Sequence, residues 1–181
     1  MEAIIDKTFT IEEPIEKVWV NLSNPMEIAS CVPGAEITEK IDDTNFKGEV
    51  TLKLGPIKSK YDGHIELVEV DNSNHKMVLS GKGLDSKGKG SAEMTMTGTL
   101  TETEAGTEVN FQMKITIIGT LAQFGSRLIN DVSDQMLNQF IDNFKAMLSG
   151  KEFDNTLSAG SMVGSVLKSK IGGIFKGKDK T

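Results

Sequence analysis

The sequence contains few of the residues on which metal sites and nucleophilic catalysis depend. Its 181 residues include one cysteine, Cys31, and two histidines, His64 and His75. A tetrahedral zinc site needs clustered cysteines and histidines, and a serine or cysteine nucleophile usually needs a positioned histidine. A single cysteine also excludes an internal disulfide. We therefore expect no metal site, no catalytic residue and a reducing compartment, with both histidines at the surface.

Long apolar runs are also missing. The first seven residues, Met1 to Lys7, meet charge almost at once, which does not match a secretory signal. The longest uncharged stretch near the C-terminus, residues 155–167, has 13 residues, whereas a bilayer-spanning helix needs about 20. We expect a cytoplasmic protein that does not span a membrane.

Positive charge is scarce except at the C-terminus. Of the net charge of −6, residues 158–181 contribute +4 and residues 151–157 contribute −1, which leaves −9 for residues 1–150. Because binding to phosphates requires a basic surface, the acidic body excludes nucleic acid as the expected partner. The charge pattern divides the chain into a domain at residues 1–150 and a basic tail at residues 151–181.

Alternation of apolar and polar residues is the main secondary-structure signal, and it predicts strands. Five runs show it, with apolar or small residues on one face: residues 46–54, 61–67, 77–83, 92–100 and 109–117. Turn residues separate these runs, as in Asp42 to Asn45, Gly55-Pro56, Asp71 to Asn74 and Glu104 to Gly106. Short connections predict antiparallel hairpins in one meandering sheet.

Helical signals lie on either side of the strand runs. After a first strand at residues 3–11, Pro14 begins one short helix, and Asn24 caps a second that starts at Pro25. Apolar residues at helical spacing predict a long helix over residues 119–148, about 45 Å in length. The expected fold is α+β: a seven-stranded antiparallel curved sheet wrapped around a long C-terminal helix, with two short helices after the first strand.

The inward face of the expected sheet is rich in glycine and methionine. Gly81, Gly83 and Gly98 interleave there with Met77, Met94, Met96 and Met113. Glycine leaves space beside a strand, and methionine adapts to irregular contents. The pattern favours an internal apolar cavity; a solid core over a sheet bent at its glycines is the alternative.

Several motifs resemble the carbon monoxide dehydrogenase G-subunit family, within the START-like (SRPBCC) helix-grip superfamily. They are Lys17-Val18-Trp19 after Pro14, Asn24-Pro25, the run from Cys31 to Glu36, the run from Gly55 to Lys60, the runs Leu79 to Gly83 and Lys89 to Ala92, the run from Gly119 to Ile129, and the run from Gln139 to Phe144. The resemblance covers residues 2–148, and the Gly119 to Ile129 run is its most specific part.

The resemblance implies a non-catalytic accessory protein. Members of that family are similar to carriers of a hydrophobic molecule, such as a respiratory quinone, that serve or help assemble a molybdenum-hydroxylase-type redox enzyme at the membrane. It implies no covalently bound cofactor. Two alternatives stay open: a cyclase or dehydratase acting on a polyketide-like aromatic ligand, and an assembly factor whose cavity is incidental.

The expected ligand site lies between the sheet and the long helix. Tyr61 or Gln123 is suited to orient a ring carbonyl, and Arg127 is expected to pair with Asp131 four residues later. Ordinary core packing is the alternative for each apolar member. The expected ligand-binding residues are Tyr61, Met77, Met94, Met96, Phe111, Met113, Leu121, Phe124, Gly125, Leu128 and Val132.

The tail combines apolar, small and basic residues. Wound as a helix, it places most apolar side chains on one side and most lysines on the other, which is typical of a segment lying on a membrane surface. Its glycines and serines keep a flexible tail as the alternative. The expected membrane-binding residues are Met162, Val166, Leu167, Lys168, Lys170, Ile171, Ile174, Phe175, Lys176 and Lys178.

Overall fold

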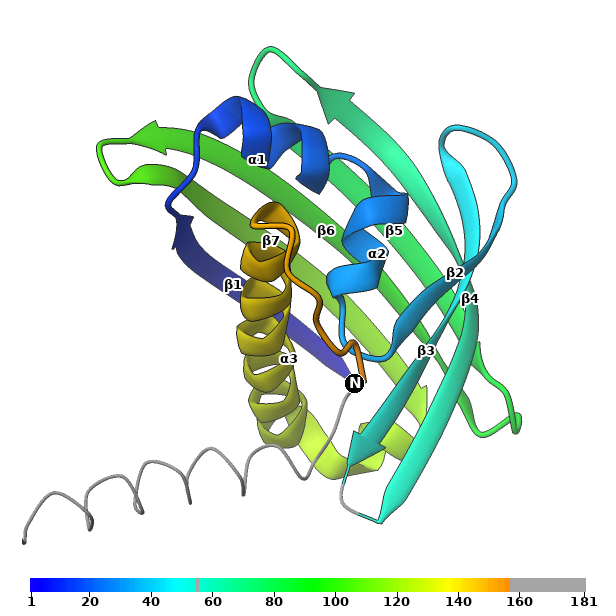
Figure 1. The fold of residues 1–181 in the computed structure, drawn as a ribbon. Helices are drawn as coiled ribbons and strands as arrows, with labels where there is room; N and C mark the ends of the chain where they lie inside the picture. The colour runs from blue at the N-terminus through cyan, green and yellow to red at the C-terminus, as the bar shows by residue number, and fades with distance from the viewer. Residues whose placement is uncertain (55, 157–181) are drawn as a thin grey trace, which may run out of the picture.

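The computed structural model describes residues 1–54 and 56–156, which form a curved sheet around a long helix (Figure 1). The strands are β1 (Glu2–Ile11), β2 (Ala35–Lys40), β3 (Asn45–Leu54), β4 (Ile57–Asp71), β5 (Lys76–Asp85), β6 (Gly90–Thr103) and β7 (Gly106–Gly119). The helices are α1 (Ile15–Leu22), α2 (Pro25–Cys31), the 3-10 helix η1 (Thr120–Phe124) and α3 (Gly125–Leu148).

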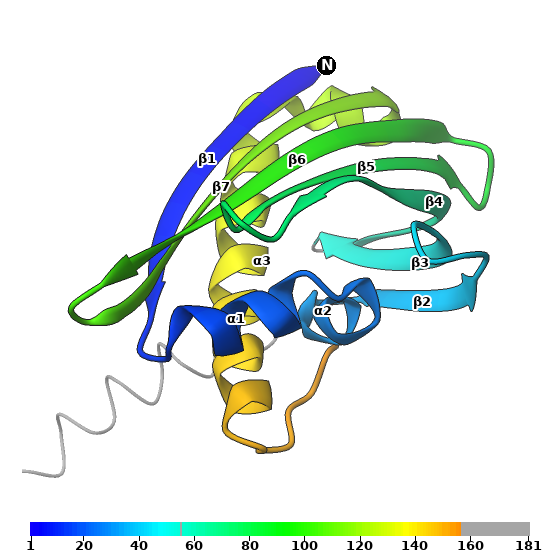
Figure 2. The ribbon, with the colours of Figure 1, turned by 90° about the horizontal axis from the view of Figure 1, so that it is seen from above.

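The sheet is one antiparallel meander closed by its first strand. Its order is β1-β7-β6-β5-β4-β3-β2, and every neighbouring pair is antiparallel. Seen from above, the strands arch over α3, and α1 and α2 lie along the open side (Figure 2). The predicted helix-grip fold is therefore confirmed, including both short helices after the first strand.

The two short helices begin where the sequence predicted. Pro14 precedes α1, and the Oδ1 atom of Asn24 accepts a hydrogen bond from the backbone N–H of Met26 at 3.1 Å, which caps α2. The indole Nε1 of Trp19 donates to Oδ1 of Asn72 at 2.9 Å. This bond ties α1 to the β4–β5 hairpin and holds the Trp19 ring against the inside of the sheet.

The long helix is shorter than predicted because two glycines interrupt the chain before it. β7 continues to Gly119, which has a φ of 99°, and η1 ends at Gly125, with φ 76° and ψ 171°. The second conformation is essentially restricted to glycine. The expected helix over residues 119–148 is therefore wrong at its start, and α3 has 24 residues, about 36 Å.

The packed part of the chain continues beyond the expected boundary at residue 150. The backbone carbonyl of Asn155 accepts from the N–H of Gly34 at 2.8 Å, and its Nδ2 donates to the carbonyl of Ala35 at 3.0 Å. Gln139 on α3 donates to the carbonyl of Thr156 at 3.0 Å. Residues 151–156 thus form part of the domain.

The residues expected to contact a membrane lie outside the described part of the chain. They are Met162, Val166, Leu167, Lys168, Lys170, Ile171, Ile174, Phe175, Lys176 and Lys178. Within residues 1–54 and 56–156, no helix has both the length and the apolar character needed to cross a bilayer.

Candidate functional site

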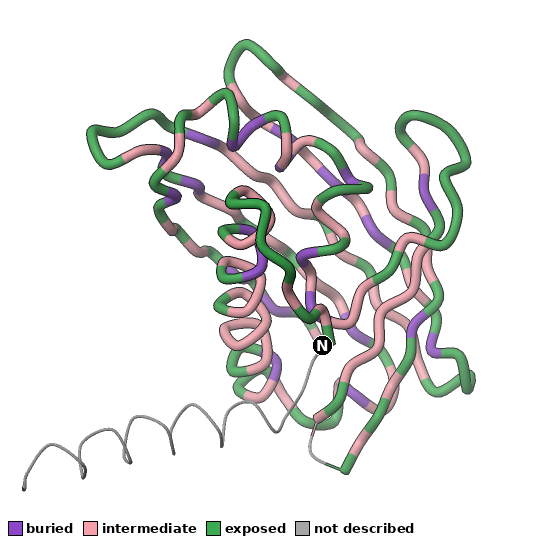
Figure 3. Tube along the Cα trace, in the orientation of Figure 1, coloured by how far each residue is buried: buried purple, intermediate pink, exposed green. Residues whose placement is uncertain are grey.

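An apolar pocket of about 480 Å³ lies between the concave face of the sheet and α3. This volume falls within the range of about 300–1,000 Å³ that is usual for small-molecule sites. The inward residues of β3 to β7 form its wall, and α1, α2, η1 and α3 complete it. Buried and half-buried positions follow the inner faces of the strands, whereas exposed positions gather at the hairpin tips (Figure 3).

Most of the expected ligand-site residues lie in the wall of this pocket. Tyr61 and Leu121 are buried there, and Val132 contributes from α3. The expected residues that line the pocket are Tyr61, Met77, Met94, Met96, Phe111, Met113, Leu121 and Val132. Whether a ligand occupies the pocket stays a prediction.

Phe124, Gly125 and Leu128 do not line the pocket, which corrects three of the expected positions. The sequence placed them on one face of a continuous helix, but the break at Gly125 changes the helical phase. As a result Ile129 faces the pocket from the first turns of α3, and the Phe124 side chain is 39% exposed.

Helix α2 supplies a part of the wall that the sequence analysis missed. Pro25, Ile28, Ala29 and Val32 line the pocket. Their spacing of three, one and three residues is that of one face of a helix, so the signal is present in the sequence. The run is short and lies far along the chain from the strand residues that it faces, and spacing alone therefore indicates only a connecting helix.

Gly98 on β6 marks open space inside the pocket. A Cβ atom built at this position meets no heavy atom within 4 Å. The other inward glycines differ, because a Cβ at Gly63 would lie 2.6 Å from the carbonyl oxygen of Lys82, and one at Gly81 would touch the Met94 side chain. The space at Gly98 therefore belongs to the pocket.

Tyr61 carries the polar group best placed to bind a ligand. Its hydroxyl makes no hydrogen bond with a residue that the structure describes, although the side chain is only 6% exposed. Asn155 Oδ1 is the one fully buried side-chain N or O atom without a partner in the described ranges, so the Tyr61 oxygen is not sealed by protein. Burial, and secondarily the charge of Asp85, raises the pKa of Tyr61. The hydroxyl is therefore a neutral donor at physiological pH.

Other polar residues along the wall use their hydrogen-bonding groups elsewhere. Ser133 on α3 donates its hydroxyl to the carbonyl of Ile129 at 2.7 Å. Strand alternation places His64 and Lys82 outward, where His64 Nε2 lies 2.9 Å from Asn45 Oδ1 and Lys82 lies 3.7 Å from Glu93. The described wall therefore presents one hydroxyl within an apolar surface, and no pair of side chains positioned as an acid and a base.

The remaining candidate residues lie away from the pocket. Gln123 is exposed and does not line it, and Arg127 makes no ion pair with Asp131 or another described acid, which corrects that expectation. Cys31 is buried beside Met147, with its Sγ 3.6 Å from the Met147 Sδ, and burial raises the pKa of its thiol. No cluster of three or more potential metal ligands occurs in the described ranges.

Solved structures share this fold at low sequence identity. A conserved protein from Geobacillus kaustophilus aligns with a TM-score of 0.71 at 19% identity, covering 83% of this chain and 96% of that one. The Zhui aromatase/cyclase from a Streptomyces species aligns with a TM-score of 0.58 at 11% identity, covering 82% and 94%. Ara h 8.0201 aligns with a TM-score of 0.55 at 12% identity, covering 83% and 100%.

The sequence itself matches a family over most of the described domain. A comparison with curated proteins gives no match. The family model for the carbon monoxide dehydrogenase G subunit (CoxG), in contrast, matches residues 8–149, a range that contains α1, α2, the strands β2 to β7 and all of α3. The helix-grip chain described here belongs to the CoxG family of carbon monoxide dehydrogenase.

Proposed function

We propose that this protein is a non-catalytic carrier of an apolar molecule that bears a carbonyl group, such as a respiratory quinone. The observation that carries the proposal is the apolar pocket, in which the Tyr61 hydroxyl is the one wall hydroxyl left without a partner among the described residues. Burial of apolar area contributes about 25 cal/mol per Å², and one neutral donor is enough to orient a carbonyl.

A cyclase or dehydratase is the second candidate, favoured by the fold that the chain shares with an aromatase/cyclase. Such an enzyme needs polar groups that converge on the reacting atoms. Ser133 donates to its own helix and Tyr61 has a raised pKa, so neither provides a base near neutral pH. These contacts support a carrier over an enzyme.

The partners follow from the family and from the tail. Membership in the CoxG family supports service to, or assembly of, a molybdenum-hydroxylase-type redox enzyme. The basic tail supports contact with the inner face of the membrane. Changing Lys168, Lys170, Lys176 and Lys178 to Gln in the full chain is expected to weaken sedimentation with anionic vesicles and to flatten its salt dependence. Unchanged sedimentation would assign the tail another role.

Filling the pocket tests the carrier directly. Gly98→Leu places a side chain in open space, and a bound ligand would then be overpacked by about 1–3 kcal/mol. Binding of the uncharged fluorescent probe N-phenylnaphthylamine should weaken by at least about tenfold. Thr95→Leu is the matched control, because Thr95 lies on the exposed face of the same strand. Equal probe affinity in both variants would refute the pocket as the binding site.

A further inference from the structure

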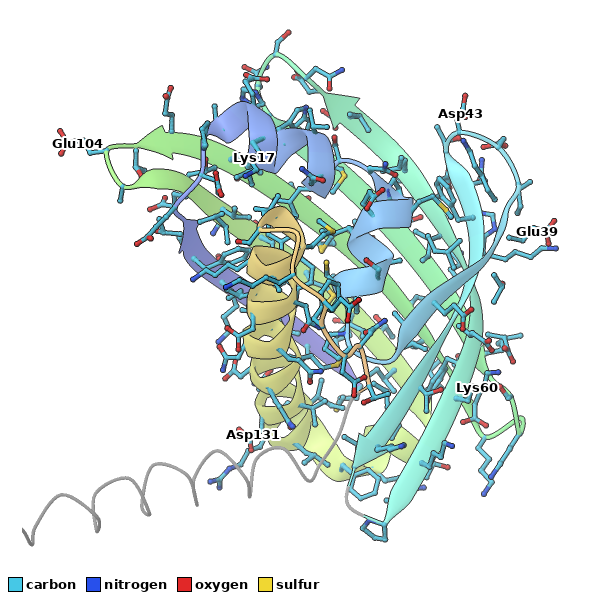
Figure 4. The ribbon with its side chains drawn as sticks, viewed as in Figure 1. Lys17, Glu39, Asp43, Lys60, Glu104 and Asp131 are labelled. Carbon is cyan, nitrogen blue, oxygen red and sulfur yellow. The ribbon has the colours of Figure 1, made fainter. Side chains whose placement is uncertain are left out.

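The two ends of the sheet carry charges of opposite sign. In an antiparallel meander, consecutive hairpins lie at alternate ends. The β2–β3, β4–β5 and β6–β7 hairpins share one end, and Figure 4 shows Asp43 and Glu104 at the tips of two of them. The acidic residues of these hairpins are Asp42, Asp43, Asp71, Glu102 and Glu104.

The opposite end carries cations on three neighbouring segments. The β3–β4 hairpin, the β5–β6 hairpin and η1 with the first turn of α3 lie together at the lower end of the sheet (Figure 1). We call this surface the basic end and define it by Lys53, Lys58, Lys87, Lys89 and Arg127. These cations stand out on a domain whose residues 1–150 carry a net charge of −9.

The cations of the basic end are not neutralised by neighbouring acids. None of them forms an ion pair within residues 1–54 and 56–156, whereas lysines elsewhere on the sheet and on α1 do. The paired lysines are Lys7, Lys17, Lys40, Lys47, Lys60, Lys76, Lys82 and Lys114. The nearby Asp85 is buried, and its Oδ1 accepts from the backbone N–H groups of Lys87 and Lys89.

Exposed apolar side chains accompany these cations. Leu84 is 67% exposed and Ile118 is 61% exposed, and both are in register with Ser91 between them on the outer face. Phe124 of η1 is also exposed at this end. Lysines around exposed apolar side chains are typical of surfaces that contact a lipid interface, because the charges meet anionic headgroups while the apolar groups enter the boundary below them.

Part of the pocket wall is accessible near the basic end. There the wall includes Leu52 and Leu54, which are half-buried and flank Lys53 on β3. At the other end the wall includes buried residues such as Trp19, Leu22 and Leu100. An apolar molecule that left a bilayer at the basic end would therefore have a short path into the pocket.

We propose that the basic end is a docking surface for an anionic phospholipid bilayer, which orients the accessible part of the pocket wall toward the lipid. The inference rests on the proposed carrier function for its purpose, but its evidence is separate: the clustered unpaired cations and the apolar side chains between them. An acidic protein surface would satisfy the charges alone, and the exposed Leu84, Ile118 and Phe124 favour a bilayer.

Charge removal in the full chain tests this surface. The test variant combines Lys53→Gln, Lys58→Gln, Lys87→Gln and Lys89→Gln. The control combines Lys17→Gln, Lys40→Gln, Lys47→Gln and Lys76→Gln, which removes the same charge from ion-paired lysines. Sedimentation is measured with vesicles of equal parts phosphatidylcholine and phosphatidylglycerol at low salt, and with phosphatidylcholine alone. Both variants retain the tail.

The test variant should lose at least about tenfold in binding to the anionic vesicles, since each lysine near such a surface contributes about fivefold. The control should lose less than about twofold, and neither should bind N-phenylnaphthylamine differently from the unchanged chain. Equal vesicle binding by both variants, or equal losses, would overturn the docking surface and leave an acidic protein as its partner. A failure of the probe to bind the unchanged chain would contradict the carrier function alone.

Discussion

Tyr61 and Asp85 are direct neighbours on β4 and β5, and both side chains are buried at one end of the pocket. The two residues have different roles. The Asp85 carboxylate accepts from backbone N–H groups of the β5–β6 hairpin, 2.8 Å from Lys87 N, and the Tyr61 hydroxyl stays available to a ligand. The carboxylate thus stabilises the hairpin beside the pocket while its charge helps keep the tyrosine protonated.

Tyr61→Phe should separate ligand orientation from stability. The lost hydrogen bond to a ligand carbonyl is worth about 0.5–1.5 kcal/mol, so affinity for a short-chain quinone should fall by roughly twofold to tenfold. Affinity for a hydrocarbon probe of similar size should not change, because it forms no such bond. Titration of both ligands against both proteins measures the difference. Equal losses for quinone and hydrocarbon would show that Tyr61 contributes only packing.

The raised pKa of Tyr61 predicts a loss of stability at high pH. The unfolded chain ionises this hydroxyl near its ordinary value of about 10, whereas the folded protein holds the proton to higher pH. Above about pH 10 the unfolded state therefore binds fewer protons, and the free energy of unfolding falls as pH rises through the folded pKa. Urea denaturation between about pH 8 and pH 11 should show a steeper decline for the wild type than for Tyr61→Phe. Parallel curves would contradict the assignment.

The residues that sequence alone placed correctly are those whose pattern is local. Alternation over residues 109–117 and 92–100 identifies β7 and β6, and their inward faces form the pocket wall. Strand β2 gives no clear alternation, because within Ala35–Lys40 only two positions are even half-buried and its apolar signal is weak. Ile129 was missed because the phase of α3 depends on the backbone at Gly125, which residue spacing does not reveal.

Gly125→Ala should lower stability without affecting the pocket. Its φ of 76° and ψ of 171° cost a residue with a side chain about 1–3 kcal/mol, although a Cβ there meets no heavy atom within 4 Å. Because Gly125 does not line the pocket, probe affinity should stay the same. The neighbouring exposed position gives the control, Ser126→Ala. A large loss of affinity with unchanged stability would place Gly125 in the binding site after all.

Asn143→Ala tests the contact between α3 and α2. The Asn143 Nδ2 donates to the carbonyl of Cys31 at 3.0 Å, and the asparagine is buried. Its removal leaves a buried acceptor unpaired, which costs about 1–3 kcal/mol of unfolding free energy. Asn138→Ala, at an exposed position on the same helix, should change stability by less than about 0.5 kcal/mol. Similar melting temperatures for the two variants would show that this bond does not stabilise the domain.

The central claim is that the pocket carries an apolar, carbonyl-bearing molecule, and mass spectrometry of the organic extract tests it most directly. The full chain, Gly98→Leu and Thr95→Leu would be purified from a quinone-containing host without detergent. We predict that the unchanged chain and Thr95→Leu yield a quinone or a related apolar carbonyl compound, and that Gly98→Leu yields much less of it. Extracts that contain no such molecule, or the same amount from Gly98→Leu as from Thr95→Leu, would contradict the account.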